Sequence, residues 1–217
     1  MIEAKEIVIF LFRWAHVLFG ITWIGMLYYF NFVQTEYFKE ADPGALPDAK
    51  AKLAPRALWW FRWGAKFTFI TGLILLGGLQ HGGMGIDTYI VLGALLGTLM
   101  YLNVWLIIWP NQKIVLGLAE GDSAAAAPKA ALASRTNTLF SGPMAFFMLA
   151  SPHLSGAGSA LVSNNGLSLG AWIAIAVIFA LEGNAILGKP GPIASIRGVV
   201  HMSLALTAVL FLLTLFL

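Results

Sequence analysis

Residues 7–33 read IVIFLFRWAHVLFGITWIGMLYYFNFV, an apolar run interrupted by one arginine and one histidine. A helix of about 20 apolar residues is long enough to cross the hydrocarbon core of a bilayer, and this run exceeds that length. It also exceeds the apolar part of a secretory signal peptide, and it contains no clear small-residue cleavage site. We therefore expect residues 7–33 to form a retained membrane-spanning helix.

The composition of the whole chain predicts the same class of protein. Of the 217 residues, 59% are hydrophobic and only 11% are charged, whereas soluble domains carry about 25% charged residues. Lipid must therefore cover much of the exterior. The absence of cysteine excludes disulfides, thiolate iron–sulfur ligation and covalent c-type haem attachment within these residues. The net charge of +3 does not indicate nucleic-acid binding, because the basic residues lie in loops and at the ends of apolar runs.

Six apolar segments predict an all-α fold, a polytopic transmembrane bundle of about six helices in a single domain over residues 1–217. The fourth segment is shorter than a full span, so its helix either begins earlier, near Leu132, or is partly buried by its neighbours. The alanine-rich stretch before it, which ends at Pro128, predicts a separate short helix on the membrane surface. The six segments are Ile7–Val33, Trp60–Gln80, Thr88–Trp109, Asn137–Ser151, Ser168–Leu187 and Val199–Leu217.

The distribution of basic residues predicts the orientation of the chain. Of its 13 lysines and arginines, only Lys5 and Arg13 lie on one side of a six-helix arrangement. Cytoplasmic loops carry the excess of basic residues in membrane proteins. We therefore expect both termini on the outer side and the first, third and fifth connections on the inner side.

Two histidines are candidate ligands of a metal or cofactor. His16 lies inside an apolar segment, where an ionisable group is costly unless it faces a partner in the bundle. Either a neutral His16 hydrogen-bonds to a neighbouring helix, which the sequence alone favours, or its ring nitrogen ligates the iron of a b-type haem. His153, at the outer end of the fourth segment, is the better candidate for a second ligand, and His81 is expected to be an ordinary solvated residue.

Polar residues near the inner boundary form a second candidate site. Glu182 lies about one turn inside the membrane, where a carboxylate pairs with a cation or takes part in function. We expect a structural ion pair with Arg135, Arg197 or His201, and as a second role proton transfer or substrate contact. The other polar residues expected near this boundary are Arg62, Asn111, Gln112, Arg135 and Asn137.

Four separated motifs resemble, in the same order, the membrane domain of the bacterial urate hydroxylase family. They are RWAHVLFGITWIG (13–25), WWFRWGAKFT (59–68), NVWLIIWPNQKIVLG (103–117) and RTNTLFSGPMAFFM (135–148). Members of that family commonly join such a domain to a C-terminal cytochrome c domain. The resemblance implies oxidation of a small molecule, with the motif residues Arg62, Asn111, Gln112, Arg135 and Asn137 as candidate catalytic residues. Glu182 joins these candidates because of its depth in the membrane. Arginine and amide groups are suitable donors to an anionic, carbonyl-rich heterocycle such as urate.

The sequence thus predicts a urate-hydroxylase-like oxidoreductase of the bacterial inner membrane. It would bind b-type haem through His16 and His153 and pass electrons to a separate c-type cytochrome, because no cysteine is present to attach a haem covalently. One alternative is a non-catalytic membrane subunit of a larger respiratory or photosynthetic complex, packed through glycine-rich helix faces. A transporter or channel is a third interpretation, although the sequence lacks the repeats or broken helices typical of that class.

Overall fold

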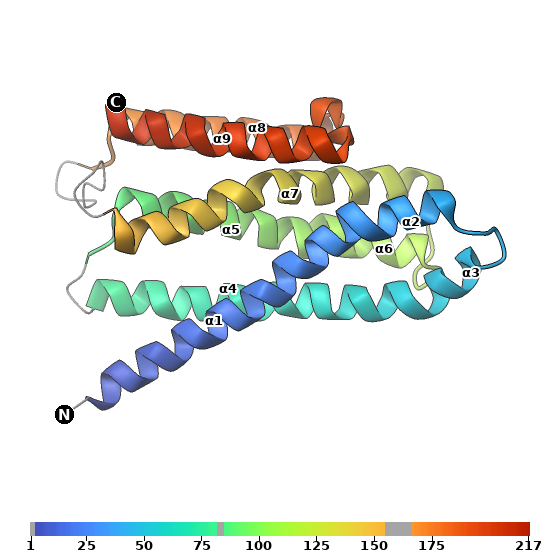
Figure 1. Ribbon diagram of the computed structural model, residues 1–217, viewed down its shortest axis with the longest axis horizontal. Helices are drawn as coiled ribbons and strands as arrows, with labels where there is room; N and C mark the ends of the chain where they lie inside the picture. Colours follow the sequence, from blue (N-terminus) through green and yellow to red (C-terminus); the bar gives the residue numbers. More distant parts are fainter. Residues whose placement is uncertain (1–2, 82–84, 155–165) are drawn as a thin grey trace.

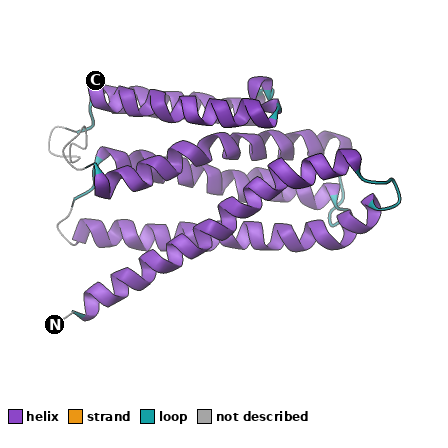
Figure 2. Cartoon of the chain, viewed as in Figure 1, coloured by secondary structure: helices purple, strands orange, loops and turns teal. Residues whose placement is uncertain are grey.

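A computed structural model describes residues 3–81, 85–154 and 166–217. Within these ranges the regular elements are all helical and no strand forms (Figure 2). Long helices lie side by side, with α1 crossing α4 obliquely and α8 paired with α9 at the far side (Figure 1). The fold is therefore a helix bundle, as the sequence predicts.

Each predicted apolar segment lies within a long helix, except that Ser168 and Leu217 fall one residue outside α8 and α9. The first helix runs without interruption as α1 (Ala4–Tyr28), the π-helical η1 (Tyr29–Gln34) and α2 (Thr35–Glu40). The third is α5 (Thr88–Leu102), the π-helical η3 (Asn103–Ile108) and α6 (Trp109–Val115). The others are α4 (Ala54–His81), α7 (Ser123–His153), α8 (Leu169–Leu187) and α9 (Ile196–Phe216).

Four helices of the described chain are both long and apolar enough to cross a membrane. They are Ala4–Glu40, Thr88–Val115, Leu169–Leu187 and Ile196–Phe216. The other two long helices, α4 and α7, have 28 and 31 residues, which also exceeds the length of a span. They lie alongside the spanning helices (Figure 1) but include polar residues at the end where the first and third connections lie.

The prediction of a separate surface helix before α7 is wrong. α7 begins at Ser123 and includes the alanine-rich stretch, Pro128 and the whole fourth apolar segment. Its N-cap is Asp122, whose side chain accepts hydrogen bonds from the backbone N–H groups of Ala124 and Ala125. Alanine has the highest intrinsic helix propensity, so this stretch extends the helix beyond the apolar segment. Short elements fill the first and fifth connections: α3 (Leu46–Asp48), the π-helical η2 (Ala49–Leu53) and the 3₁₀-helical η4 (Gly191–Ala194).

A continuous core of buried apolar side chains runs through the bundle. Its largest buried members are Trp23, Tyr89, Phe61, Phe140 and Phe147. Only the second half of α1 contributes to this core. The first half of α1 leans away from the other helices (Figure 1), and its apolar side chains are largely exposed. Lipid would cover these side chains in a membrane.

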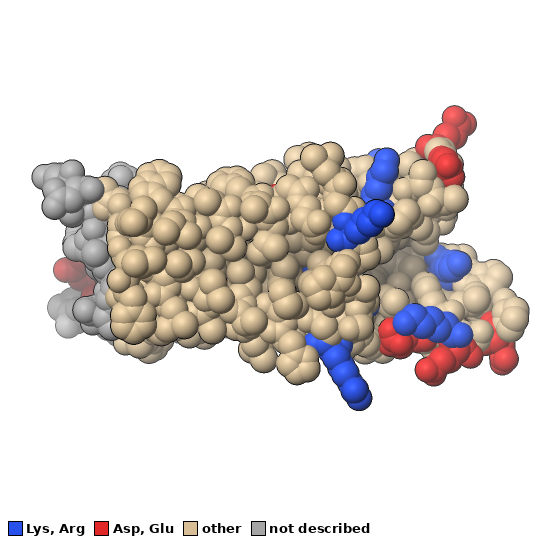
Figure 3. All heavy atoms as spheres, turned by 90° about the horizontal axis from the view of Figure 1, so that it is seen from above, with Lys and Arg blue, Asp and Glu red and all other residues tan. Residues whose placement is uncertain are grey.

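The two ends of the bundle differ sharply in charge. Lysine, arginine and acidic side chains gather at one end of the face shown in Figure 3, and a broad uncharged surface adjoins them. That end carries α2, α3, α6 and the start of α4 (Figure 1). The connections predicted to be cytoplasmic therefore lie together, as the orientation rule requires. We call this the basic end.

Candidate functional site

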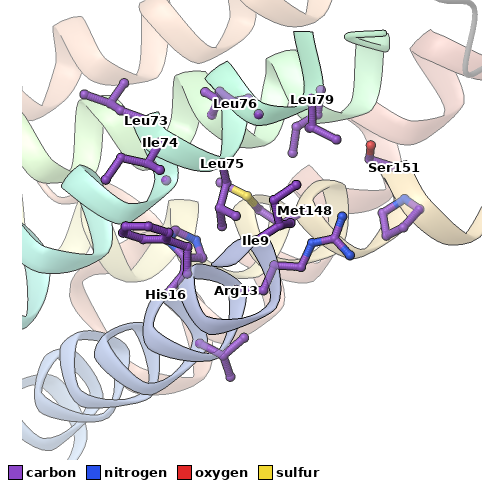
Figure 4. A pocket seen from close by; sticks show the side chains of 18 of the residues that line it. Ile9, Arg13, His16, Leu73, Ile74, Leu75, Leu76, Leu79, Met148 and Ser151 are labelled. Atoms are coloured by element: carbon purple, nitrogen blue, oxygen red, sulfur yellow. The ribbon is translucent and has the colours of Figure 1, made fainter. Parts of the chain in front are cut away.

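A cavity of about 1430 Å³ opens where the first half of α1 leans away from α4, α5 and α7. Its lining is mostly aliphatic, with methionines from α7 and a few polar groups (Figure 4). Ligand pockets typically measure about 300–1,000 Å³ and combine apolar walls with a few convergent polar groups. This cavity exceeds that range and lies away from the basic end, which corresponds to the predicted outer half of the membrane.

His16 projects from α1 into this cavity beside Arg13 (Figure 4). Its Nδ1 lies 3.0 Å from Oγ1 of Thr71 on α4. The Thr71 hydroxyl in turn donates to the backbone carbonyl of Phe67 at 2.7 Å, with the carbonyl of Thr68 also at 3.0 Å. A hydroxyl has a single proton, and where Thr71 donates it to its own helix, His16 Nδ1 is the donor of the bond between α1 and α4. The neutral ring therefore carries its lone pair on Nε2.

This arrangement is the one that a metal-ligating histidine requires. Such histidines donate one ring N–H to an oxygen acceptor, which fixes the tautomer, and coordinate through the other nitrogen. A glycine makes the ring position feasible, because a Cβ at Gly72 would lie only 3.0 Å from His16 Cε1. The interhelical hydrogen bond expected for His16 is present, and it is also compatible with the ligand role.

His153 lines the same cavity from the end of α7. It is exposed, and its Nδ1 donates to the carbonyl of Leu149 at 2.8 Å, which leaves Nε2 with the lone pair. Charged groups at the cavity are Lys5, Arg13 and Asp87, and Asp87 accepts a hydrogen bond from Ser151 at 2.7 Å. The structure therefore brings the two predicted cofactor ligands to one cavity.

The residues present fit a haem better than a metal ion held by protein ligands alone. The described part of the chain has no group of three or more His, Cys, Asp or Glu side chains that could hold a metal ion. A haem supplies four nitrogen ligands itself, so one or two histidines suffice. An apolar cavity with an imidazole lone pair at its wall meets that need. The side chain of His81 lies outside the described residues.

The second candidate site divides into two groups. The first is a buried network, here called the inner polar cluster, formed by Asn103, Asn137 and Glu182. Asn103 Nδ2 donates to Asn137 Oδ1 at 3.0 Å and to Glu182 Oε2 at 3.1 Å. Asn137 Nδ2 donates to the carbonyl of Met100 at 2.9 Å. The network thus ties α5 and η3 to α7 and α8.

The ion pair predicted for Glu182 does not form. The salt bridges of the described residues join Lys39 to Glu36 and Lys52 to Asp48. Glu182 is 7% exposed and takes an amide as its partner. Asn103 occupies the position that a cation was expected to fill, because η3 carries its side chain toward α7 and α8.

The second group lies on α4 and α6. The Arg62 guanidinium stacks 3.9 Å from the ring centre of Trp109. Asn111 donates to its own helix at the carbonyl of Ile107, 2.7 Å away, and Gln112 is half-buried. No hydrogen bond among the described residues joins this group to the inner polar cluster.

Arg135, two residues before Asn137 on α7, differs from both groups. It is buried on α7, and its Nη1 has no hydrogen-bond partner. The charge of Glu36 on α2 acts on it, although no ion pair forms. A buried guanidinium with an unused donor is suited to bind an anion.

Thr71 and Asn103 are functional candidates that sequence reasoning did not assign to a site. Thr71 and Gly72 lie three and four residues after Thr68, so the three residues share one face of an apolar helix. That small, polar face was a signal that the helix packs against a polar group. Asn103 begins the third resemblance motif and lies among the polar residues near the inner boundary, but its pairing with Glu182 depends on the π-helical turn that begins there.

Comparison with known families gives one match. A family model described as "Urate oxidase N-terminal" matches residues 78–182, from the end of α4 into α8. The matched range contains Asn103, Arg135, Asn137, His153 and Glu182, whereas His16 and Arg62 lie before it. No curated protein and no solved structure matches the chain.

Proposed function

We propose that this chain, of which residues 78–182 match a urate oxidase family model, is a membrane oxidoreductase that holds a b-type haem in the cavity beside α1. It would oxidise a small anionic heterocycle and pass the electrons to a separate c-type cytochrome. The family match supports the urate-hydroxylase-like relationship. The observation that carries the haem proposal is the hydrogen-bonded state of His16.

His16 offers an Nε2 lone pair at the wall of a large apolar cavity. Its Nδ1–H is already donated to Thr71 at 3.0 Å, so the ring is held in the ligating tautomer. His153 would supply a second imidazole from α7. A bound haem would supply one-electron redox chemistry, and the apolar walls would exclude water from it. Arg13 and Lys5 are the cationic groups at the cavity that would pair with haem carboxylates.

The position of the cavity favours an electron acceptor on the outer side. The cavity lies away from the basic end, and basic connections face the cytoplasm. In a bacterial inner membrane the cavity would therefore lie toward the periplasm, where a c-type cytochrome could dock. This placement rests on the charge distribution of the chain.

Arg135 is our choice for the residue that anchors the anionic substrate. Its guanidinium is buried with an unused donor, so it can pair with a urate-like anion through charge-assisted hydrogen bonds. The inner polar cluster, Arg62, Asn111 and Gln112 would complete the polar surroundings from neighbouring helices.

The experiment is a turnover assay with purified protein, urate and soluble oxidised cytochrome c. Urate-dependent reduction of the cytochrome is expected for wild type. Replacement His16→Ala should abolish it. His201→Ala should not change it, because His201 is exposed on α9 and bonds only to its own helix at Arg197.

Haem-free protein that purifies with a large membrane complex and shows no turnover would contradict the proposal. That result would support the non-catalytic subunit instead. The variant Arg135→Lys should keep its haem and lose activity at low urate concentration, because lysine cannot reproduce the guanidinium fork. Unchanged dependence on urate concentration in this variant would remove Arg135 from the substrate site.

A further inference from the structure

Three tryptophans and three basic residues form a cluster on α4, η3 and α6, and of these six only Arg62 also belongs to the proposed substrate surroundings. Lys66 Nζ lies 4.7 Å from the ring centre of Trp63 and 5.6 Å from that of Trp105. Trp109 lies between two cations, with Arg62 at 3.9 Å and Lys113 at 5.8 Å. We call this set the tryptophan–cation cluster. Its members are Arg62, Trp63, Lys66, Trp105, Trp109 and Lys113.

The cluster has no anionic partner within the described chain. The ion pairs of the described residues use Lys39 and Lys52 and none of the cluster cations. Neighbouring like charges repel more strongly near the hydrocarbon than in bulk water, because the dielectric constant is lower there. The indole rings attract the cations but do not neutralise them. An external anion would complete the charge balance.

Two hydrogen-bond donors at the same place are also unused. The indole Nε1 atoms of Trp63 and Trp105 are buried and have no partner. Their rings pack edge to face with ring centres 6.1 Å apart, and Lys66 lies beside both rings. Buried N–H groups normally find an acceptor, so these two donors remain available to a ligand oxygen that enters the cluster.

The depth of the cluster corresponds to the headgroup region on the inner side. Trp59 and Trp60 are exposed one turn before it on α4, as residues of an aromatic interfacial belt are. Lys66 lies about 10 Å further along the helix. Side chains on a helix point back toward its N-terminus, which here is the basic end, so the ammonium group reaches back toward the interface.

We propose that the tryptophan–cation cluster is a binding site for an anionic phospholipid of the inner leaflet. The phosphate would accept hydrogen bonds from Arg62, Lys66 and the two indole N–H groups, and the acyl chains would lie along the apolar surface of α4. The predicted cytoplasmic leaflet is the one that attracts clustered basic residues. This site does not depend on haem or on urate.

Native mass spectrometry of the detergent-purified protein tests the site. The protein is titrated with phosphatidylglycerol and, separately, with phosphatidylcholine. Phosphatidylglycerol is expected to bind more tightly to wild type. Lys66→Gln should weaken phosphatidylglycerol binding by roughly fivefold, as expected for one basic residue at an anionic surface. Lys129→Gln is the matched control, since Lys129 is exposed on α7 near the same end, and should not change the affinity.

A second pair of variants keeps the test valid if Lys66→Gln fails to fold. Trp105→Phe keeps an aromatic ring but removes the indole N–H, and should weaken binding by about tenfold because a bond to a charged acceptor is lost. Lys66→Arg should retain wild-type binding. Equal binding of the two lipids, or unchanged affinity in Lys66→Gln and Trp105→Phe, would overturn the proposal. Competition by millimolar inorganic phosphate or urate that displaces the lipid fully would instead assign the site to a free anion.

Discussion

The substitution Thr71→Val tests whether the His16 hydrogen bond positions a ligand. Valine has nearly the shape of threonine, so packing between α1 and α4 is retained and only Oγ1 is lost. The structure assigns that oxygen one external role, accepting from His16 Nδ1 at 3.0 Å. Loss of such a partner lowers metal affinity by about 10- to 100-fold, or roughly 1.4–2.7 kcal/mol.

Haem dissociation and the midpoint potential are the two measurements for this variant. We expect Thr71→Val to release haem to an apo-protein acceptor about 10- to 100-fold faster than wild type. The midpoint potential should rise by up to about 59 mV for each tenfold loss of affinity for oxidised haem relative to reduced haem. Thr98→Val is the control, because Thr98 also lines the cavity but donates only to its own helix at Ala94. Identical haem release and potential in the two variants would refute the positioning role of Thr71.

Further predictions concern packing and the inner polar cluster. Gly72→Ala should weaken haem binding, because the added Cβ would lie 3.0 Å from the ring of His16. Gly78→Ala should be neutral, because its Cβ would meet nothing within 4 Å. Haem content per protein measures both variants, and equal haem content in the two would contradict the prediction. Asn137→Leu should lower the free energy of unfolding in detergent by about 1–2 kcal/mol, from two lost hydrogen bonds within a membrane bundle. Asn184→Leu should lower the free energy of unfolding far less, because Asn184 is exposed and makes one long hydrogen bond to Lys189. An equal loss of stability in the two variants would argue against a structural role for the inner polar cluster.

The helix positions are largely predictable from the sequence because run length decides them. Ser168, for example, ends one loop as the N-cap of α8, and its side chain accepts from the N–H of Ala171. The start of α7 was missed, because hydropathy marks where a helix enters lipid and not where the helix begins. Asp122 and the alanines after it carry the start signal, but Pro128 suggested a break. That proline is tolerated inside the long helix.

The π-helical turns could not be predicted from the pattern of apolar residues. η1 and η3 each alter the direction of the side chains that follow, and such turns frequently accompany functional sites. In η1, Asn31 donates to Ser134 on α7 at 2.8 Å. In η3, Asn103 takes the place expected for an arginine or histidine beside Glu182. Pairings of this kind depend on helix rotation, which single-residue spacing does not determine.

The candidate cofactor site was predictable in part. An ionisable residue within an apolar run marked His16, and topology placed His153 at the same end of the bundle. The specific contribution of α4 was not evident beyond a small, polar helix face, because Thr71 and Gly72 are common residue types in membrane helices. Only the crossing of α1 over α4 shows that Thr71 hydrogen-bonds to the His16 ring and that Gly72 leaves room for this ring.

The reduced-minus-oxidised absorption spectrum of purified wild type beside His16→Ala and His201→Ala tests the central proposal most directly. The account predicts a b-type haem signal in wild type and in His201→Ala, and its loss in His16→Ala. A wild-type protein without haem, or a haem signal that survives His16→Ala unchanged, would contradict the account and leave His16 as a residue that packs α1 against α4.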